Sequence, residues 1–118
     1  MNYLKTNIKN KRIAFYIRYY RQEDYDKQLD AFFQFLAVNE VRLDEVEIFE
    51  DVRKDSDDIR WGLYEMVMNI ENFDFITVYA PQFLHLNHEE FLRLKEIFID
   101  SSCDLIILSE QREDFQDE

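Results

Sequence analysis

Residues 12–19 read Arg-Ile-Ala-Phe-Tyr-Ile-Arg-Tyr, a short run of apolar and β-favouring residues that predicts a buried strand. Three similar runs follow along the chain, at residues 46–49, 75–79 and 105–108. Between them, apolar residues recur at helical spacing in residues 24–39, 59–70 and 87–100. The order βαβαβαβ predicts an α/β fold in which helices cover both faces of a parallel sheet.

The segment ends indicate where helices begin and where a functional site would lie. Asp24 and Asn87 have side chains suited to cap the first and third helices. In a parallel sheet, ligands and active sites gather at the carboxyl ends of the strands. We therefore expect any site to draw on residues 18–21, 50–55, 79–83 and 109–111.

Length and composition fit one folded domain. The chain has 118 residues, of which 47% are hydrophobic and 16% aromatic, enough for a modest core. No apolar run approaches the roughly 18 residues that span a bilayer, and the polar, basic start lacks the apolar stretch of a signal peptide. One cysteine, Cys103, allows no internal disulfide and favours a reducing, cytoplasmic location. We divide the chain into a basic arm (1–11), an α/β domain (12–109) and an acidic tail (110–118).

Charge is distributed unevenly along the chain. The net charge is −12, with +6 in residues 1–21 and −18 in the remainder. A body of that sign repels a phosphate backbone, so direct DNA binding is not expected. Only the amino-terminal arm has the charge to contact nucleic acid.

Several stretches carry a family resemblance. They are the first strand (15–20, Phe-Tyr-Ile-Arg-Tyr-Tyr), Gln28 in the next helix, residues 48–51 with 59–63, residues 73–78, and residues 81–86. In this order they resemble the catalytic domain of the resolvase/invertase family of serine site-specific recombinases, over residues 12–110. The resemblance implies a three-layer sandwich, with a mostly parallel four-stranded sheet in the order 2-1-3-4 flanked by helices.

The departures from the family pattern fall on its chemistry. In that family a serine after the first strand attacks a DNA phosphate, and arginines neutralise the developing charge. Here Tyr20 stands in place of the serine, Gln82 and Phe83 in place of an Asp-Arg pair, and Leu86 in place of a later arginine. Arg18, Asp51 and Arg60 match the pattern. We therefore expect a degenerate site with no catalytic residues; Tyr20 as a substitute nucleophile is the minor alternative.

Other polar clusters favour no metal or cofactor. His85, His88, Glu89 and Glu90 lack a third well-spaced His or Cys ligand, and the acidic residues between 50 and 58 lack the glycine and spacing of a calcium loop. Arg18 and Arg60 have the charge to bind an anion, but we favour their pairing with Asp51.

The surplus of aromatic residues indicates protein contacts. Phe32, Phe33 and Phe35 cannot all face one core stripe, and surface aromatics there or at Tyr19, Tyr20 and Phe83 would form a binding patch. The leading hypothesis is an inactive recombinase-like domain that binds itself or another protein, such as an active recombinase. Two alternatives stay open: an acidic decoy that imitates DNA and occupies a DNA-binding protein, and a residual DNA- or anion-binding enzyme.

Overall fold

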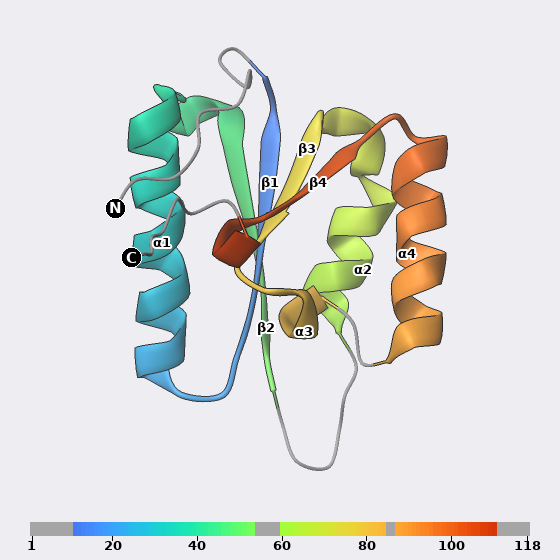
Figure 1. Cartoon of the computed structure of the whole chain (residues 1–118), viewed down its shortest axis with the longest axis horizontal. Helices are drawn as coiled ribbons and strands as arrows, with labels where there is room; N and C mark the ends of the chain where they lie inside the picture. The colour runs from blue at the N-terminus through green and yellow to red at the C-terminus, as the bar shows by residue number, and fades with distance from the viewer. Residues whose placement is uncertain (1–10, 54–59, 85–86, 111–118) are drawn as a thin grey trace.

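A four-stranded sheet forms the centre of the computed structural model, which describes residues 11–53, 60–84 and 87–110 (Figure 1). All neighbouring strands are parallel, in the order β2-β1-β3-β4. The strands are β1 (Ile13–Tyr19), β2 (Val46–Val52), β3 (Phe75–Val78) and β4 (Asp104–Ile107). The predicted fold class and strand order are therefore confirmed.

Helices lie on both faces of this sheet, as Figure 1 shows. Helix α1 (Gln22–Asn39) covers one face, and α2 (Trp61–Met68) and α4 (His88–Asp100) cover the other. A short helix, α3 (Pro81–Leu84), follows β3, and single 3-10 turns occupy Leu43–Glu45, Ile70–Asn72 and Leu108–Glu110. No helix in the described ranges is long and apolar enough to cross a membrane.

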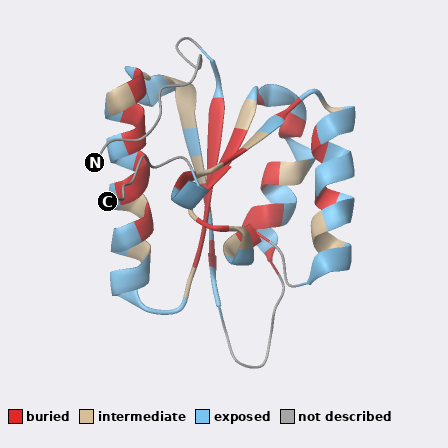
Figure 2. Cartoon of the chain, viewed as in Figure 1, coloured by how far each residue is buried: buried red, intermediate tan, exposed pale blue. Residues whose placement is uncertain are grey.

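Strand β1 is the most enclosed strand, and all of its residues except Arg18 are apolar or aromatic. It pairs with β2 on one side and β3 on the other, and its first six residues are buried (Figure 2). Side chains alternate along a strand, so Phe15 packs with the α1 layer while Tyr16 packs with the α2 and α4 layer. The Phe15 ring stacks on Phe32 of α1 with centroids 4.0 Å apart. Both cores are thus anchored on one strand.

Two predicted helix starts have different outcomes. The prediction for Asn87 is confirmed, since its side chain accepts a hydrogen bond of 2.8 Å from the Glu90 amide at the start of α4. The prediction for Asp24 is wrong, because α1 begins two residues earlier, at Gln22, and Asp24 lies within its first turn. Arg21 occupies the cap position without a side-chain hydrogen bond.

Two further expectations concern β2 and the α1 aromatics. Strand β2 extends to Val52, so Glu50 and Asp51 lie within the strand instead of after it. Among the three phenylalanines of α1, Phe32 and Phe35 are buried while Phe33 is exposed. The expectation that one of them must leave the core is confirmed.

Candidate functional site

A pocket of about 210 Å³ lies at the carboxyl ends of the strands. Strand β1 and the turn after it supply Arg18, Tyr19 and Tyr20, while Arg53 follows β2. The turn is fixed to β2 because the Arg53 amide donates a 2.7 Å hydrogen bond to the Tyr19 carbonyl. The remaining lining residues are Asp24 of α1 and Gln82 and Phe83 of α3.

The pocket gathers most of the positions that the sequence singled out. Arg18, Tyr20, Gln82 and Phe83 come from segments more than sixty residues apart and line one hollow. Tyr19, which was assigned to a contact patch, lines it too. Leu86 and His85 lie outside the described residues.

Asp51 lies beneath this surface and serves the start of helix α2. Its carboxylate accepts hydrogen bonds from the backbone amides of Gly62, at 2.7 Å, and Leu63, at 3.0 Å. These are two of the amides that a helix start leaves without an intrahelical partner. The Tyr16 hydroxyl donates a third hydrogen bond to it, at 2.6 Å. Asp51 therefore joins β1, β2 and α2.

Arg60 is buried, and groups of the chain itself take up most of its donors. Its Nε donates to the Tyr16 hydroxyl at 3.3 Å and its Nη1 to a Glu90 carboxylate oxygen at 3.2 Å. Its Nη2 donates to the carbonyls of Phe83 and Leu84, at 3.0 and 2.6 Å. The guanidinium thereby ties α3 and α4 to the sheet, which favours a structural role over anion binding.

The ion pair of Arg60 differs from the one we expected. Its carboxylate partner is Glu90, and Tyr16 lies between Arg60 and Asp51. The Tyr16 hydroxyl is buried and bonded to a carboxylate, and both effects raise the pKa of Tyr16. It therefore stays protonated and acts as a donor to Asp51 while it accepts from Arg60.

Gln28, the remaining family-like residue, also has an internal partner. Its side chain is buried in α1, and its amide donates a 3.0 Å hydrogen bond to the carbonyl of Arg18. This contact fixes the end of β1 against α1 directly below the pocket. Gln28 thus holds the backbone on which Arg18, Tyr19 and Tyr20 are displayed.

Chemically, the pocket offers charge and aromatic surface. Its lining includes two guanidinium groups, one carboxylate, two phenols, an amide and a phenyl ring. Such a set can hold an anion or a planar group. Among these lining residues there is no serine, threonine or cysteine. Within the described parts of the chain, no group of three or more His, Cys, Asp or Glu side chains is arranged to hold a metal ion.

The sequence matches no family model and no curated protein significantly. The structure, however, resembles several solved ones. The N-terminal catalytic domain of TP901-1 integrase aligns with a TM-score of 0.72 and 23% identity, over 86% of this chain and 80% of that one. A resolvase family site-specific recombinase from Streptococcus pneumoniae aligns with a TM-score of 0.72 and 19% identity, over 92% and 78%. The C-terminal catalytic domain of ISC1926 TnpA, an IS607-like serine recombinase, aligns with a TM-score of 0.68 and 16% identity, over 82% of this chain and 70% of that one.

The chain has the fold of a serine-recombinase catalytic domain. The resemblance inferred from the motifs is confirmed at the level of fold. On this recombinase fold, Asp51 and Arg60 are part of the framework around α2 and α3, while Tyr20 lines the pocket.

Sequence reasoning missed several residues of this region. The sequence assigned Tyr16 only to a strand, Glu90 to a solvated helix start and Gly62 to a helix pattern. In the structure Tyr16 bonds to Asp51, and Glu90 accepts from Arg60. Gly62 lies against the backbone of Glu50 in β2. A signal was present for Gly62, since it is the only glycine of the chain. No signal indicated Glu90, because its partner lies thirty residues away.

Proposed function

We propose that this serine-recombinase-type domain lacks strand-cleavage chemistry and acts through contacts with protein. The observation that carries the proposal is the lining of the strand-end pocket. Tyr20, Gln82 and Phe83 stand where the resembled family has its nucleophile and an Asp-Arg pair. Loss of a single preorganised charge partner commonly lowers a rate by about 10²–10³, so the combined loss leaves no efficient phosphoryl chemistry.

The roles of the matching residues support the same proposal. Asp51 and Arg60 match the family pattern, and both make buried hydrogen bonds that join the sheet to its helices. Tyr20, Gln82 and Phe83, which differ from the pattern, line the open pocket together with Arg18, which matches it. A chain that keeps Asp51 and Arg60 and changes three residues of the pocket lining retains the fold without the chemistry.

An exposed apolar surface on α2 supports the protein-contact part. Trp61, Tyr64 and Met68 are 70%, 56% and 85% exposed, and we call them the α2 patch. Their i, i+3, i+7 spacing places them on one side of the helix, and the rings of Trp61 and Tyr64 meet edge to face at 6.1 Å. Tryptophan and tyrosine are enriched among residues that dominate protein interfaces. Tyr19, Tyr20 and Phe83, the contact patch predicted from the sequence, are a second candidate surface for protein contacts. The side chain of Tyr20 is 56% exposed.

The wild-type protein is expected to form no covalent complex with supercoiled or nicked DNA. Replacing Tyr20 by phenylalanine removes the only hydroxyl at the nucleophile position, so the two proteins are expected to show the same background in a gel assay for protein–DNA adducts. A Ser56→Ala variant belongs in the series, because Ser56 follows in sequence soon after the carboxyl end of β2. An adduct that disappears in either variant would contradict the proposal and identify the attacking hydroxyl.

A partner retained by the full chain in a pull-down is expected to be lost from a Trp61→Ala, Met68→Ala double variant. Contacts of apolar side chains should survive about 0.5 M salt, at which electrostatic attraction is strongly screened. Leu43→Ala is the matched control, since Leu43 is 68% exposed on a different element. A strict monomer in sedimentation that retains no partner counts against protein contacts, and retention abolished by salt alone favours the acidic decoy.

A further inference from the structure

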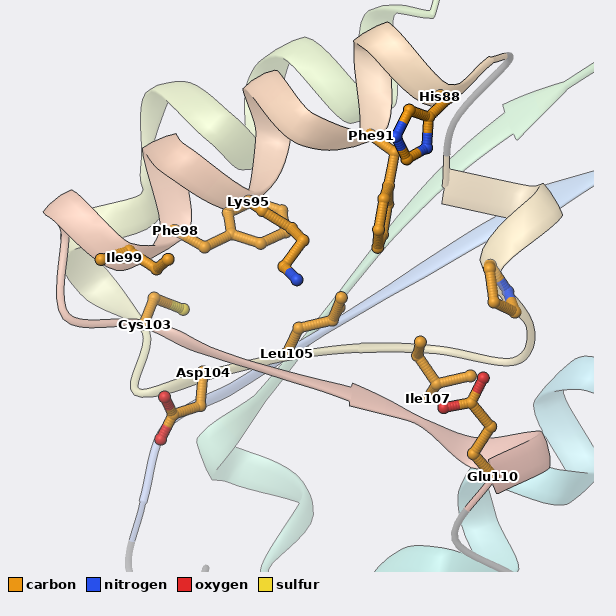
Figure 3. A pocket seen from close by; sticks show the side chains of 11 residues that line it. His88, Phe91, Lys95, Phe98, Ile99, Cys103, Asp104, Leu105, Ile107 and Glu110 are labelled. Atoms are coloured by element: carbon orange, nitrogen blue, oxygen red, sulfur yellow. The ribbon is translucent and has the colours of Figure 1, made fainter.

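A second and larger hollow lies between α4 and β4. Its volume is about 680 Å³, and Figure 3 shows side chains of both elements pointing into it. Phe91 and Phe98 come from the helix, and Leu105 and Ile107 from the strand. We call this hollow the α4–β4 groove. Its Cys103 is not a reactive thiol, because burial raises the pKa of Cys103 to about 12.

The groove runs along an open edge of the sheet. Strand β4 is last in the order β2-β1-β3-β4, so β3 is its one neighbour among the described strands. The Asp104 amide donates to the Asp74 carbonyl at 3.1 Å, which shows that Asp104 points its backbone groups toward β3. Successive residues of a strand bond on alternate sides. The backbone groups of Leu105 and Ile107 therefore point toward the open edge.

The open backbone and the apolar wall belong to the same two residues. Leu105 and Ile107 present their amides and carbonyls along the edge and their side chains to the groove. An extended segment laid along β4 would pair with this backbone and direct alternate side chains toward Phe91 and Phe98. This is the arrangement of β-strand addition, in which backbone hydrogen bonds give affinity and pockets for alternate side chains give specificity.

Charge determines which kind of segment fits. Acidic residues lie at the two ends of the edge, Asp104 at its start and Glu110 beyond its end, on a chain whose net charge is −12. The cation on the groove wall, Lys95, has its ammonium over the Phe91 ring at 5.4 Å. A second copy of this chain would bring its own Asp104 and Glu110 to the same edge, which like-charge repulsion disfavours.

We propose that the α4–β4 groove binds an extended segment of a partner protein, with alternating apolar residues flanked by lysine or arginine, as an added strand on β4. The inference deepens the proposed protein-contact function by naming a binding mode and a partner chemistry. It uses neither the α2 patch nor the strand-end pocket. A Tyr20-dependent DNA adduct would therefore overturn the proposed function without affecting the groove.

The test measures binding of the labelled peptide Lys-Arg-Val-Thr-Ile-Thr-Val-Arg-Lys to the full chain by fluorescence anisotropy, with amide shifts followed by NMR. Binding is expected to shift the amides of Leu105 and Ile107 and to slow their hydrogen exchange. A peptide N-methylated at alternate residues and a peptide with Glu at the four basic positions are both expected to bind at least about tenfold more weakly, which corresponds to about 1.4 kcal/mol.

Ile107→Pro is the decisive variant, because it removes an amide that faces the open edge and no hydrogen bond to β3. Edge strands tolerate proline at such positions, and its melting temperature checks the fold. Val52→Pro is the matched control on the opposite edge of the sheet. The Arg53 amide there donates to β1, and successive residues bond on alternate sides, so the Val52 amide points away from the sheet. We expect weaker peptide binding, by about tenfold, to Ile107→Pro and unchanged binding to Val52→Pro.

Three results would overturn the proposal. They are no binding to the wild-type chain, equal binding of the N-methylated or acidic peptide, and equal binding to Ile107→Pro. A dimer of the wild-type chain in sedimentation that Ile107→Pro abolishes would assign the edge to a second copy instead of a basic segment.

Discussion

Asp51→Ala is expected to lower the free energy of unfolding by about 3–5 kcal/mol, because each buried polar group left without its partner costs about 1–3 kcal/mol. The substitution leaves the Tyr16 hydroxyl and the amides of Gly62 and Leu63 without their acceptor. It also removes the carboxylate that accepts a hydrogen bond from the same Tyr16 hydroxyl to which Arg60 Nε donates. Because small domains are stable by only about 5–15 kcal/mol, urea unfolding should show a large drop in the midpoint.

Two milder variants separate the contributions at this position. Asp51→Asn keeps an acceptor for the start of α2 and loses the charge, so its cost is expected to lie below that of alanine. Tyr16→Phe leaves both backbone amides bonded to Asp51 and deprives Arg60 Nε of its acceptor, at about 1–3 kcal/mol. If Tyr16→Phe proved costlier than Asp51→Ala, the helix start would not be the main role of this carboxylate.

The strands and long helices could be predicted because their signal is local. The alternation of short apolar runs with helical spacing indicates βαβ units wherever the partners lie. The errors are local as well. The prediction ended β2 at Phe49, because Glu50 and Asp51 look like loop residues, whereas Asp51 is buried by contacts with β1 and α2. Helix α3, which has four residues and begins at Pro81, offers too few positions for a periodic pattern.

The site could be predicted only in part, for a physical reason. The motif spacing placed Arg18, Tyr20, Gln82 and Phe83 at strand ends, and the parallel order brings those ends together. The pairing of Arg60 with Glu90 depends on how α4 packs beside α2 and α3, which no local pattern encodes. The role of each charged residue therefore required the tertiary structure, while its approximate location did not.

Gly62→Ala is expected to destabilise the chain by about 3 kcal/mol, at the upper end of the usual cost of overpacking. A Cβ atom at this position would lie 2.4 Å from the Glu50 carbonyl oxygen and 2.9 Å from its carbon. Both are backbone atoms of β2, which is held in register with β1, so they cannot move aside as a flexible side chain would. The clash would push α2 away from β2 and weaken the 2.7 Å hydrogen bond between the Gly62 amide and Asp51.

The sign of this result is the informative part. Helix propensity alone favours alanine over glycine by about 1 kcal/mol, so a chain in which α2 merely rested on the sheet would become more stable. Glu65→Ala on the exposed side of the same helix controls for propensity and is expected to change stability by less than about 0.5 kcal/mol. If Gly62→Ala unfolded at a higher urea concentration than the wild type, the result would contradict the close packing of α2 against β2 at Gly62. It would also contradict the hydrogen bonds from the start of α2 to Asp51.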